Sequence, residues 1–362
     1  MGADAGDALH RVPSLDGTQS VPTRVPTQSV GTRKVEVPLI MASPSPSPAV
    51  LPTALQPSAG PAEEPRVVLS FDVEEHYRIE AAAKLKISPE YKAHCRERLD
   101  ASTRWILGRL ARDGVRATFF IVGRIAEHNP ALIRAIHQAG HEVASHGWDH
   151  RRVHHFTPET FREDLRRSKG ALEQLTGCAV AGYRAPTFSI MRQTAWALDV
   201  LAEEGFRYDS SVYPVRHDRY GVPGAPRTPF RGGGPRRDIL ELPPATLSLM
   251  GFIMPMGGGG TFRLFPLVFM KKAIAQVCRA GGLPTAMLYF HPWEFDVEQQ
   301  RLPLRGVSRF RTYNGIAASR GRLDRLLSEG RTFVRAIDLV EDLGARAELL
   351  PRFAVGGNKR PA

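Results

Sequence analysis

Short apolar runs and longer amphipathic stretches alternate along residues 66–337. The short runs predict buried strands, and apolar residues at helical spacing predict helices that cover a sheet. The expected strands are 66–71, 116–122, 142–145, 179–183, a short strand before Tyr208, 239–242, 286–290 and 332–337. The expected helices are 99–112, 130–139, 158–175, 193–204 and 267–279. Repeated alternation of strand and helix is typical of a parallel α/β architecture.

Segments without this alternation precede or interrupt the predicted domain. Residues 1–64 are rich in Pro, Ser, Thr and Ala, a composition that predicts disorder, and Met41 is an alternative start. Residues 214–238 are rich in Pro, Gly and Arg and are expected to form a long loop. The glycines at 257–260 are not followed by the Lys and Ser or Thr of a phosphate loop, so we expect a flexible turn.

The folded domain is therefore expected at residues 65–345. Its last part, from about residue 295, is an arginine-rich extension with nine arginines between 301 and 335, and residues 346–362 read as a basic tail. The whole chain of 362 residues carries a net charge of +12, which favours an anionic partner or an arginine-rich solvated surface. Its three cysteines show no CxxC spacing, which argues against a zinc knuckle or a disulfide framework.

Ionisable side chains follow four of the expected strands. In a parallel α/β barrel, the carboxyl ends of the strands meet at one face, where catalytic groups are placed. The pattern therefore predicts one site built from several loops. Its candidate residues are Asp72, Glu74, His146, His150, Arg184 and His291.

His146 and His150 are candidate metal ligands. Residues four apart on a helical turn share a face, so both imidazoles could point at one ion. Imidazole suits zinc and related divalent metals. The spacing alone is common, and the other strand-end residues are what make a metal site the favoured interpretation.

Five stretches in order resemble the motifs of the polysaccharide deacetylase family, also called NodB-homology domains or carbohydrate esterase family 4. The resemblance covers residues 67–338, and the FDVE and FHPWE stretches are similar to a subgroup associated with exosortase and exopolysaccharide gene clusters. It implies a deformed (β/α) barrel. The stretches are Ser70-Phe71-Asp72-Val73-Glu74, His146-Gly147-Trp148-Asp149-His150, Arg184-Ala185-Pro186-Thr187-Phe188, Tyr208-Asp209-Ser210-Ser211 and Leu288-Tyr289-Phe290-His291.

The resemblance also implies roles for the polar residues. Asp72 would be the general base and Arg184 its partner, while His291 would be the general acid and Asp209 would raise the pKa of its imidazole. A divalent metal, with Zn²⁺ favoured over Co²⁺, Ni²⁺ or Mn²⁺, would be held by Glu74 and the two histidines after the third strand.

The first motif departs from the family pattern. Two adjacent aspartates are replaced by Asp72 and Glu74, which are two residues apart. Two alternatives therefore stay open: Glu75 could be the metal carboxylate, or Asp72 and Glu74 could exchange roles.

The predicted function is metal-dependent N-deacetylation of an amino-sugar polysaccharide or oligosaccharide, in exopolysaccharide biosynthesis. The alternatives are hydrolysis of another non-peptide amide of the cyclic ureide type, and a catalytically dead glycan-binding protein. Trp293, Pro186 and Tyr313 are candidate substrate-binding residues, and the two aromatic rings among them could stack on pyranose faces.

The charge of the chain predicts its partner, and the lack of an apolar stretch in its first 20 residues predicts its location. Arg301, Arg305, Arg309 and Arg311 follow the His291 region, so we expect an acetylated glycan substrate that is anionic or lipid-linked. No nucleic-acid motif accompanies the charge, and no run of 18 apolar residues predicts a membrane span. The first 20 residues contain no apolar stretch, which predicts a cytoplasmic location, with export as the alternative.

Overall fold

The computed structural model describes residues 64–217, 219–280 and 283–357. The stretch predicted to be disordered thus lies, except for Glu64, outside the described residues. Within the described part of the chain, no helix is both long and apolar enough to cross a membrane.

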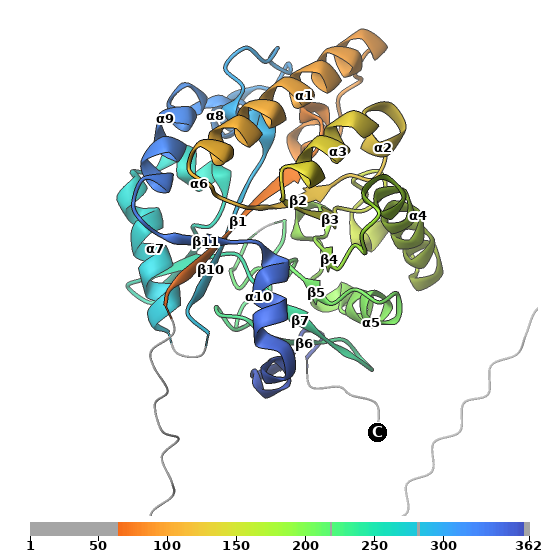
Figure 1. The fold of residues 1–362 in the computed structure, drawn as a ribbon, viewed down its shortest axis with the longest axis vertical. Helices are drawn as coiled ribbons and strands as arrows, with labels where there is room; N and C mark the ends of the chain where they lie inside the picture. Colours follow the sequence, from red (N-terminus) through yellow and green to blue (C-terminus); the bar gives the residue numbers. More distant parts are fainter. Residues whose placement is uncertain (1–63, 218, 281–282, 358–362) are drawn as a thin grey trace, which may run out of the picture. The chain divides into compact units, whose positions relative to one another are not determined.

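One curled sheet forms the centre of the fold (Figure 1). Its order is β10-β1-β2-β3-β4-β5-β7-β6-β12, and β11 pairs with the start of β1. The strands are β1 Arg66–Val73, β2 Thr118–Ile121, β3 Glu142–Ser145, β4 Gly182–Tyr183, β5 Tyr208–Asp209, β6 Phe230–Gly233, β7 Asp238–Glu241, β10 Thr285–Phe290, β11 Thr332–Val334 and β12 Arg352–Ala354. β8 Thr246–Leu249 and β9 Phe252–Pro255 form a separate hairpin.

The strands from β10 to β7 are all parallel. Pro244, just after β7, forms a parallel bridge with Met287 in β10, which brings the two ends of this parallel run together. The expected deformed (β/α) barrel is confirmed. Within the described part of this sheet, β6 and β7 are the one antiparallel pair of neighbours.

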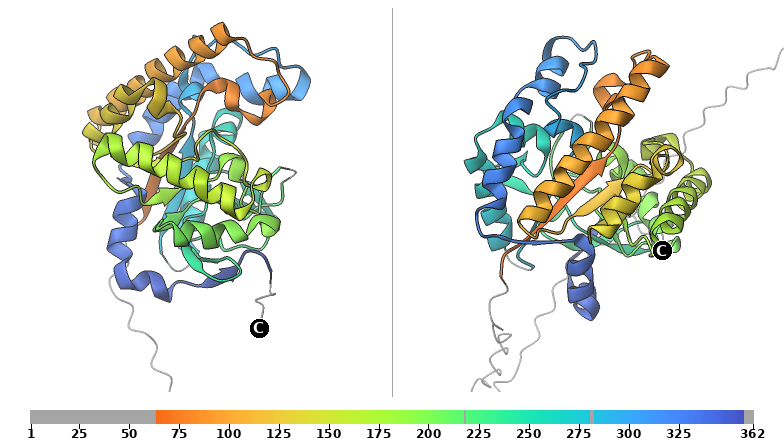
Figure 2. Two further views of the ribbon diagram at one scale, coloured as in Figure 1. Left: turned by 90° about the vertical axis from the view of Figure 1, so that its right-hand side faces the viewer. Right: turned by 45° about the horizontal axis from the view of Figure 1, so that its top comes forward.

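Helices cover the outer face of the curled sheet (Figures 1 and 2). Their apolar sides pack on the outward residues of the strands in one large cluster. They are α1 Pro89–Arg112, α2 Ile125–His128, α3 Pro130–Gln138, α4 Pro158–Thr176, α5 Trp196–Glu203, α6 Gly259–Leu264, α7 Leu267–Arg279 and α9 Ile316–Leu327. Two further helices pack elsewhere: α8 Gly306–Tyr313 contributes to a separate small cluster, and α10 Ala336–Leu343 contributes to an inner cluster.

β1 shows how strand alternation positions the site. Leu69 and Phe71 belong to the outer cluster, whereas Val68 joins an inner cluster with side chains of α10. Side chains two apart share a face of a strand, so Ser70 and Asp72 also point inward. Because β11 leads directly into α10, this helix covers the end of the barrel where β1 begins (Figure 1). Asp72 therefore lies toward the opposite, carboxyl end.

Several expectations are confirmed. β3 and α7 have the expected bounds, and α4 begins after Thr157, whose side chain accepts a hydrogen bond from the Thr160 amide. That helix ends at Gly177, which has a left-handed conformation (φ 68°) that glycine adopts without a steric cost.

Other expectations were wrong. The expected loop at 214–238 contains β6 and the first residue of β7, and the expected tail at 346–362 contains β12, which pairs with β6. The glycine run does not end as a flexible turn, because Gly259 is the first residue of α6. The β8–β9 hairpin was also not predicted. These short elements have no strong periodicity of their own and are held by tertiary pairing.

Candidate active site and metal centre

Glu74, His146 and His150 come together at the carboxyl ends of β1 and β3. Each offers one ligand atom, and the three atoms lie within 4.8 Å of one another. His150 Nε2 is 2.6 Å from Glu74 Oε2. His146 Nδ1 bonds the Arg184 carbonyl at 2.8 Å, which leaves Nε2 as its other nitrogen for a ligand. One carboxylate and two imidazoles are a donor set that fits zinc or a related divalent ion.

The two histidines do not converge through a helix, so that part of the prediction was wrong. The segment after β3 has no helical turn, and both Gly147 (φ 74°) and His150 (φ 56°) have left-handed backbone conformations. A left-handed conformation is unusual for histidine and costs energy. The chain therefore reverses sharply here, and the rings lie 5.1 Å apart.

Burial and neighbouring charges shift the pKa values of the candidate metal ligands in opposite directions. Burial would raise the pKa of Glu74, but the neighbouring His150 and then His291 and His146 lower it to about 2. Burial lowers the pKa of His146 to about 4, against the opposing field of Asp72. An ionised carboxylate and a neutral imidazole are the forms that bind a metal ion.

Glu75 does not point into this cluster. Its carboxylate bonds Arg78 at 2.5 Å and lies 3.1 Å from His128 Nε2. The alternative in which Glu75 is the metal carboxylate therefore does not agree with the structure. Glu74 occupies that position.

Asp72 is held by a fully buried arginine. Arg184 Nη1 donates to Asp72 Oδ1 at 2.6 Å and to the Ser70 hydroxyl at 2.9 Å. The guanidinium also donates to the carbonyl and hydroxyl of Ser210, and its carbon lies 4.0 Å from the Phe120 ring centroid. These bonds fix one Asp72 oxygen, and Oδ2 lies 3.9 Å from His291 Nε2.

His291 follows β10 and has a carboxylate partner that the sequence reasoning did not identify. His291 Nδ1 is 3.6 Å from Glu294 Oε2, and the His291 amide donates to the same oxygen at 3.0 Å. Burial lowers the pKa of His291, but Glu294 first, then Glu74 and Asp72, raise it to about 9. Glu294 is also 3.4 Å from the buried Arg263. Glu294 therefore favours the protonated imidazole, which is the form that a general acid requires.

The predicted pairing of Asp209 with His291 is not what the structure shows. Burial raises the pKa of Asp209 to about 6, and it faces the buried Glu241, whose pKa burial also raises. Ser211 donates to Asp209 at 2.5 Å. Because Ser210 holds Arg184, the Asp209 loop supports the partner of the base, while Glu294 is the carboxylate beside the acid.

A cavity of about 170 Å³ opens onto these groups. Trp293 is one wall of it, stacked on His291 at 5.4 Å, as expected for a residue near substrate. Pro186 and Tyr313 do not line it: the Tyr313 hydroxyl accepts a hydrogen bond from the Leu302 amide. The lining residues are Asp72, Glu74, Ile79, Glu80, His146, His150, Thr187, Phe188, Tyr220, Tyr289, His291 and Trp293.

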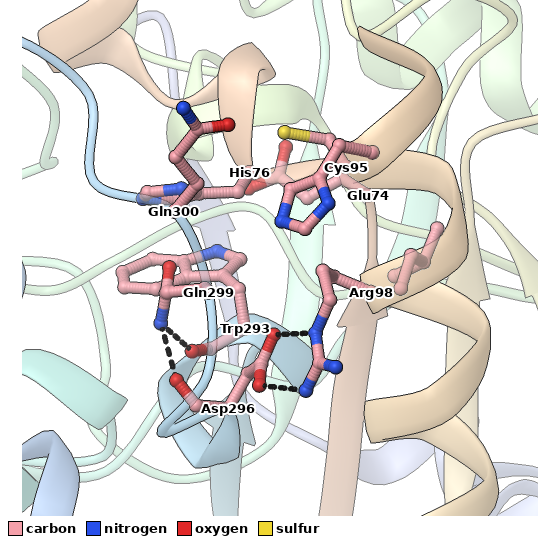
Figure 3. A pocket seen from close by; sticks show the side chains of 10 residues that line it. Glu74, His76, Cys95, Arg98, Trp293, Asp296, Gln299 and Gln300 are labelled. Atoms are coloured by element: carbon pink, nitrogen blue, oxygen red, sulfur yellow. Dashed lines mark hydrogen bonds and ion pairs between the residues drawn. The ribbon is translucent and has the colours of Figure 1, made fainter. Parts of the chain in front are cut away.

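A second, smaller space lies behind Glu74 and Trp293 (Figure 3). Its free volume of about 10 Å³ is at the lower limit for one water molecule. Both His76 ring nitrogens and the Trp293 indole nitrogen are buried there without a hydrogen bond to a described residue. One bound water would satisfy such groups, and this space is too small for a sugar.

Family and structure comparisons agree with this geometry. Residues 59–208 match the family model described as polysaccharide deacetylase, and residues 210–340 match a domain of unknown function, DUF3473. This chain therefore contains a polysaccharide deacetylase (NodB-homology) domain. The second match begins just after β5 and covers His291 and Glu294.

Known relatives match over shorter stretches. The peptidoglycan-N-acetylglucosamine deacetylase PgdA of Listeria monocytogenes is 34% identical over 91 residues, 25% of this chain and 19% of its own length. A putative polysaccharide deacetylase structure from Mycobacterium smegmatis is 25% identical with a TM-score of 0.54, covering 83% of this chain and 96% of its own. The Puue allantoinase structure is 17% identical with a TM-score of 0.53, covering 77% and 90%, and shows the fold alone. The chain spans about a fifth of the PgdA relative.

Two features of the sequence point to Glu294. It stands three residues after His291 in the FHPWE stretch, the spacing at which a side chain can return to a capping amide. The glycine run is the other signal, because a Cβ at Gly259 would lie 1.6 Å from Glu294 Oε2. A glycine that makes room for a carboxylate can be recognised only once the two segments are known to meet.

Proposed function

We propose that this protein is a metal-dependent N-deacetylase that removes acetyl groups from an amino-sugar polysaccharide or oligosaccharide. The observation that carries the proposal is the arrangement of three functions around one cavity. They are a base held by Arg184, a protonated acid at His291, and a Glu-His-His set for a divalent ion. The deacetylase family match supports the substrate class.

The metal would supply Lewis acidity, polarising the acetamide carbonyl and lowering the pKa of the attacking water. Asp72 Oδ2 would accept the proton from this water, because Oδ1 is held by Arg184. His291 Nε2 would donate a proton to the departing sugar nitrogen, and Glu294 keeps that imidazole charged and oriented. Acetate and a free amine would be the products.

In this proposal Asp72 is the general base and Glu74 is the metal ligand, rather than the opposite assignment. Glu74 lies 2.6 Å from His150, whereas one Asp72 oxygen is occupied by the Arg184 guanidinium. A carboxylate that already accepts a buried charge-assisted hydrogen bond has less freedom to close a metal site. This assignment is part of the proposal.

The proposal extends to the pathway, the metal, the substrate and the location. An exopolysaccharide pathway is supported by the FDVE and FHPWE stretches, and Zn²⁺ by the donor set. An anionic or lipid-linked glycan is supported by the arginines near the site, and a cytoplasmic location by the sequence expectation alone.

Acetate release tests the proposal. The substrates are N-acetylglucosamine oligomers, an anionic acetylated oligosaccharide and a cyclic ureide, each assayed after chelation and after return of Zn²⁺, Co²⁺, Ni²⁺ or Mn²⁺. We expect metal-dependent acetate release from an oligosaccharide. Ring opening of the ureide without acetate release would support the alternative amide hydrolase. Glycan binding with no turnover for any metal would support the non-catalytic alternative.

A further inference from the structure

Two basic segments lie side by side at one edge of the site. Residues 81–87 and 299–313 contain two lysines and four arginines and no acidic residue. The Tyr91 hydroxyl donates to the Gln300 carbonyl at 2.6 Å, and Leu85 packs on the cluster that contains Leu302. Figure 2 shows the corresponding orange and light-blue parts of the chain next to each other.

Both segments place apolar side chains inward and basic side chains outward. Leu302 and Leu304 are buried, while Arg301 before them and Arg305 after them are exposed. In the other segment, Leu85 packs against the same cluster, and Lys84 and Lys86 on either side are exposed. The alternation turns all the charge toward solvent.

α8 adds apolar side chains to this surface. Val307 is 65% exposed and Phe310 is 58% exposed, with Arg309 and Arg311 beside them. Among the described residues, no carboxylate forms a hydrogen bond or ion pair with the side chains of Arg305, Arg309 and Arg311. We call this surface the basic platform; it comprises Lys84, Lys86, Arg301, Arg305, Val307, Arg309, Phe310 and Arg311.

The basic platform borders the catalytic cavity. Ile79 and Trp293 line the cavity and also belong to, or pack on, the cluster beneath the platform. A partner that covers the platform would therefore lie next to the opening of the site.

We propose that the basic platform docks this protein on the surface of an anionic lipid bilayer. Exposed arginines and lysines are attracted to anionic headgroups within about 8–10 Å at physiological salt. Val307 and Phe310 can enter the boundary between headgroups and acyl chains, as apolar residues do on interfacial helices. Docking would hold the cavity beside substrate carried at the membrane.

The apolar side chains favour a bilayer over a soluble polyanion. A charged polysaccharide would neutralise the arginines but would leave Val307 and Phe310 in water. Clusters of exposed apolar residues with a charged surround are typical of interaction surfaces. The bilayer interface is the partner that accepts both features.

The test is sedimentation of the whole chain with vesicles of phosphatidylcholine, with and without about 30% phosphatidylglycerol. One variant removes charge, R305Q/R309Q/R311Q, and one removes apolar surface, V307S/F310S. The matched controls are R112Q/R134Q/R279Q, three exposed arginines elsewhere, and M250S/F252S, two exposed apolar residues at the tip of the β8–β9 hairpin. Thermal unfolding verifies that all variants fold.

Wild type is expected to bind only the anionic vesicles, and binding should weaken about tenfold or more from low to physiological salt. Both platform variants should lose most of this binding, and both controls should retain it. The proposal is overturned if wild type ignores the anionic vesicles, or if a control loses as much as its platform variant. It is also overturned if V307S/F310S binds as wild type while a soluble anionic polysaccharide displaces the protein. No turnover is measured, so the result is independent of the proposed deacetylase activity.

Discussion

The two halves of this chain contribute to the site in different ways. Residues up to β5 place the proposed base Asp72, its partner Arg184 and the proposed metal ligands at the ends of regular parallel strands. The later half supplies His291 and Glu294 from a turn after β10, and it holds Glu294 with Arg263 and Gly259 from α6. Local pattern is therefore informative about the first half, whereas the second half acts through packing between distant segments.

The largest effect should come from separating the roles of Asp72 and Glu74. We expect Asp72→Asn to lower kcat by about 10³–10⁴-fold while metal content stays at the wild-type level. Glu74→Gln should lose the metal as well as activity. Metal analysis and acetate release on the same preparations check this, and loss of metal from Asp72→Asn alone would reverse the two assignments.

Removing Arg184 should mainly affect folding. Arg184→Met leaves the Asp72 carboxylate buried without its partner, a change that costs about 3–5 kcal/mol of unfolding free energy. The double variant Asp72→Asn/Arg184→Met removes the orphan charge and should recover part of this loss. Denaturant unfolding measures the stability of both variants. Equal stability of the single and double variants would contradict the ion pair between Asp72 and Arg184.

Gly259→Ala tests how the second half holds the acid. The new Cβ would overlap the Glu294 carboxylate, so we expect kcat to fall about 10- to 100-fold and stability to fall by about 1–3 kcal/mol. Gly260→Ala is the matched control, because nothing lies within 4 Å of its Cβ position. Its stability should stay within about 0.5 kcal/mol of wild type. Similar behaviour of the two variants would mean that the glycine run makes no special room for Glu294.

The smallest effect should be a shift in pH dependence. His291, with a pKa of about 9, is protonated below that pH, so kcat/KM should fall as pH rises through about 9. Glu294→Gln removes the charge that favours the protonated form, which lowers the pKa and moves this decline to lower pH. Glu298→Gln, at an exposed position in the same region, should leave the pH of this decline unchanged. An unchanged profile in Glu294→Gln would exclude Glu294 as the partner of the acid.

The sequence alone indicated the barrel class, the main strands along the chain and most residues of the candidate site. β3 and α7 matched their expected bounds because apolar periodicity and end signals lie within a few residues of each other. Asp72, Glu74, Arg184 and His291 followed predicted strands, and parallel strands bring their carboxyl ends to one face.

Only the tertiary structure decided the remaining features. The short strands β6 and β12 form because each pairs with a neighbour, and their own residues carry no clear pattern. The exclusion of Glu75, the replacement of Asp209 by Glu294 beside His291, and the place of Tyr313 outside the cavity each depend on contacts between segments distant in sequence. Such contacts are determined by packing and charge pairing in three dimensions, which one-dimensional periodicity does not encode.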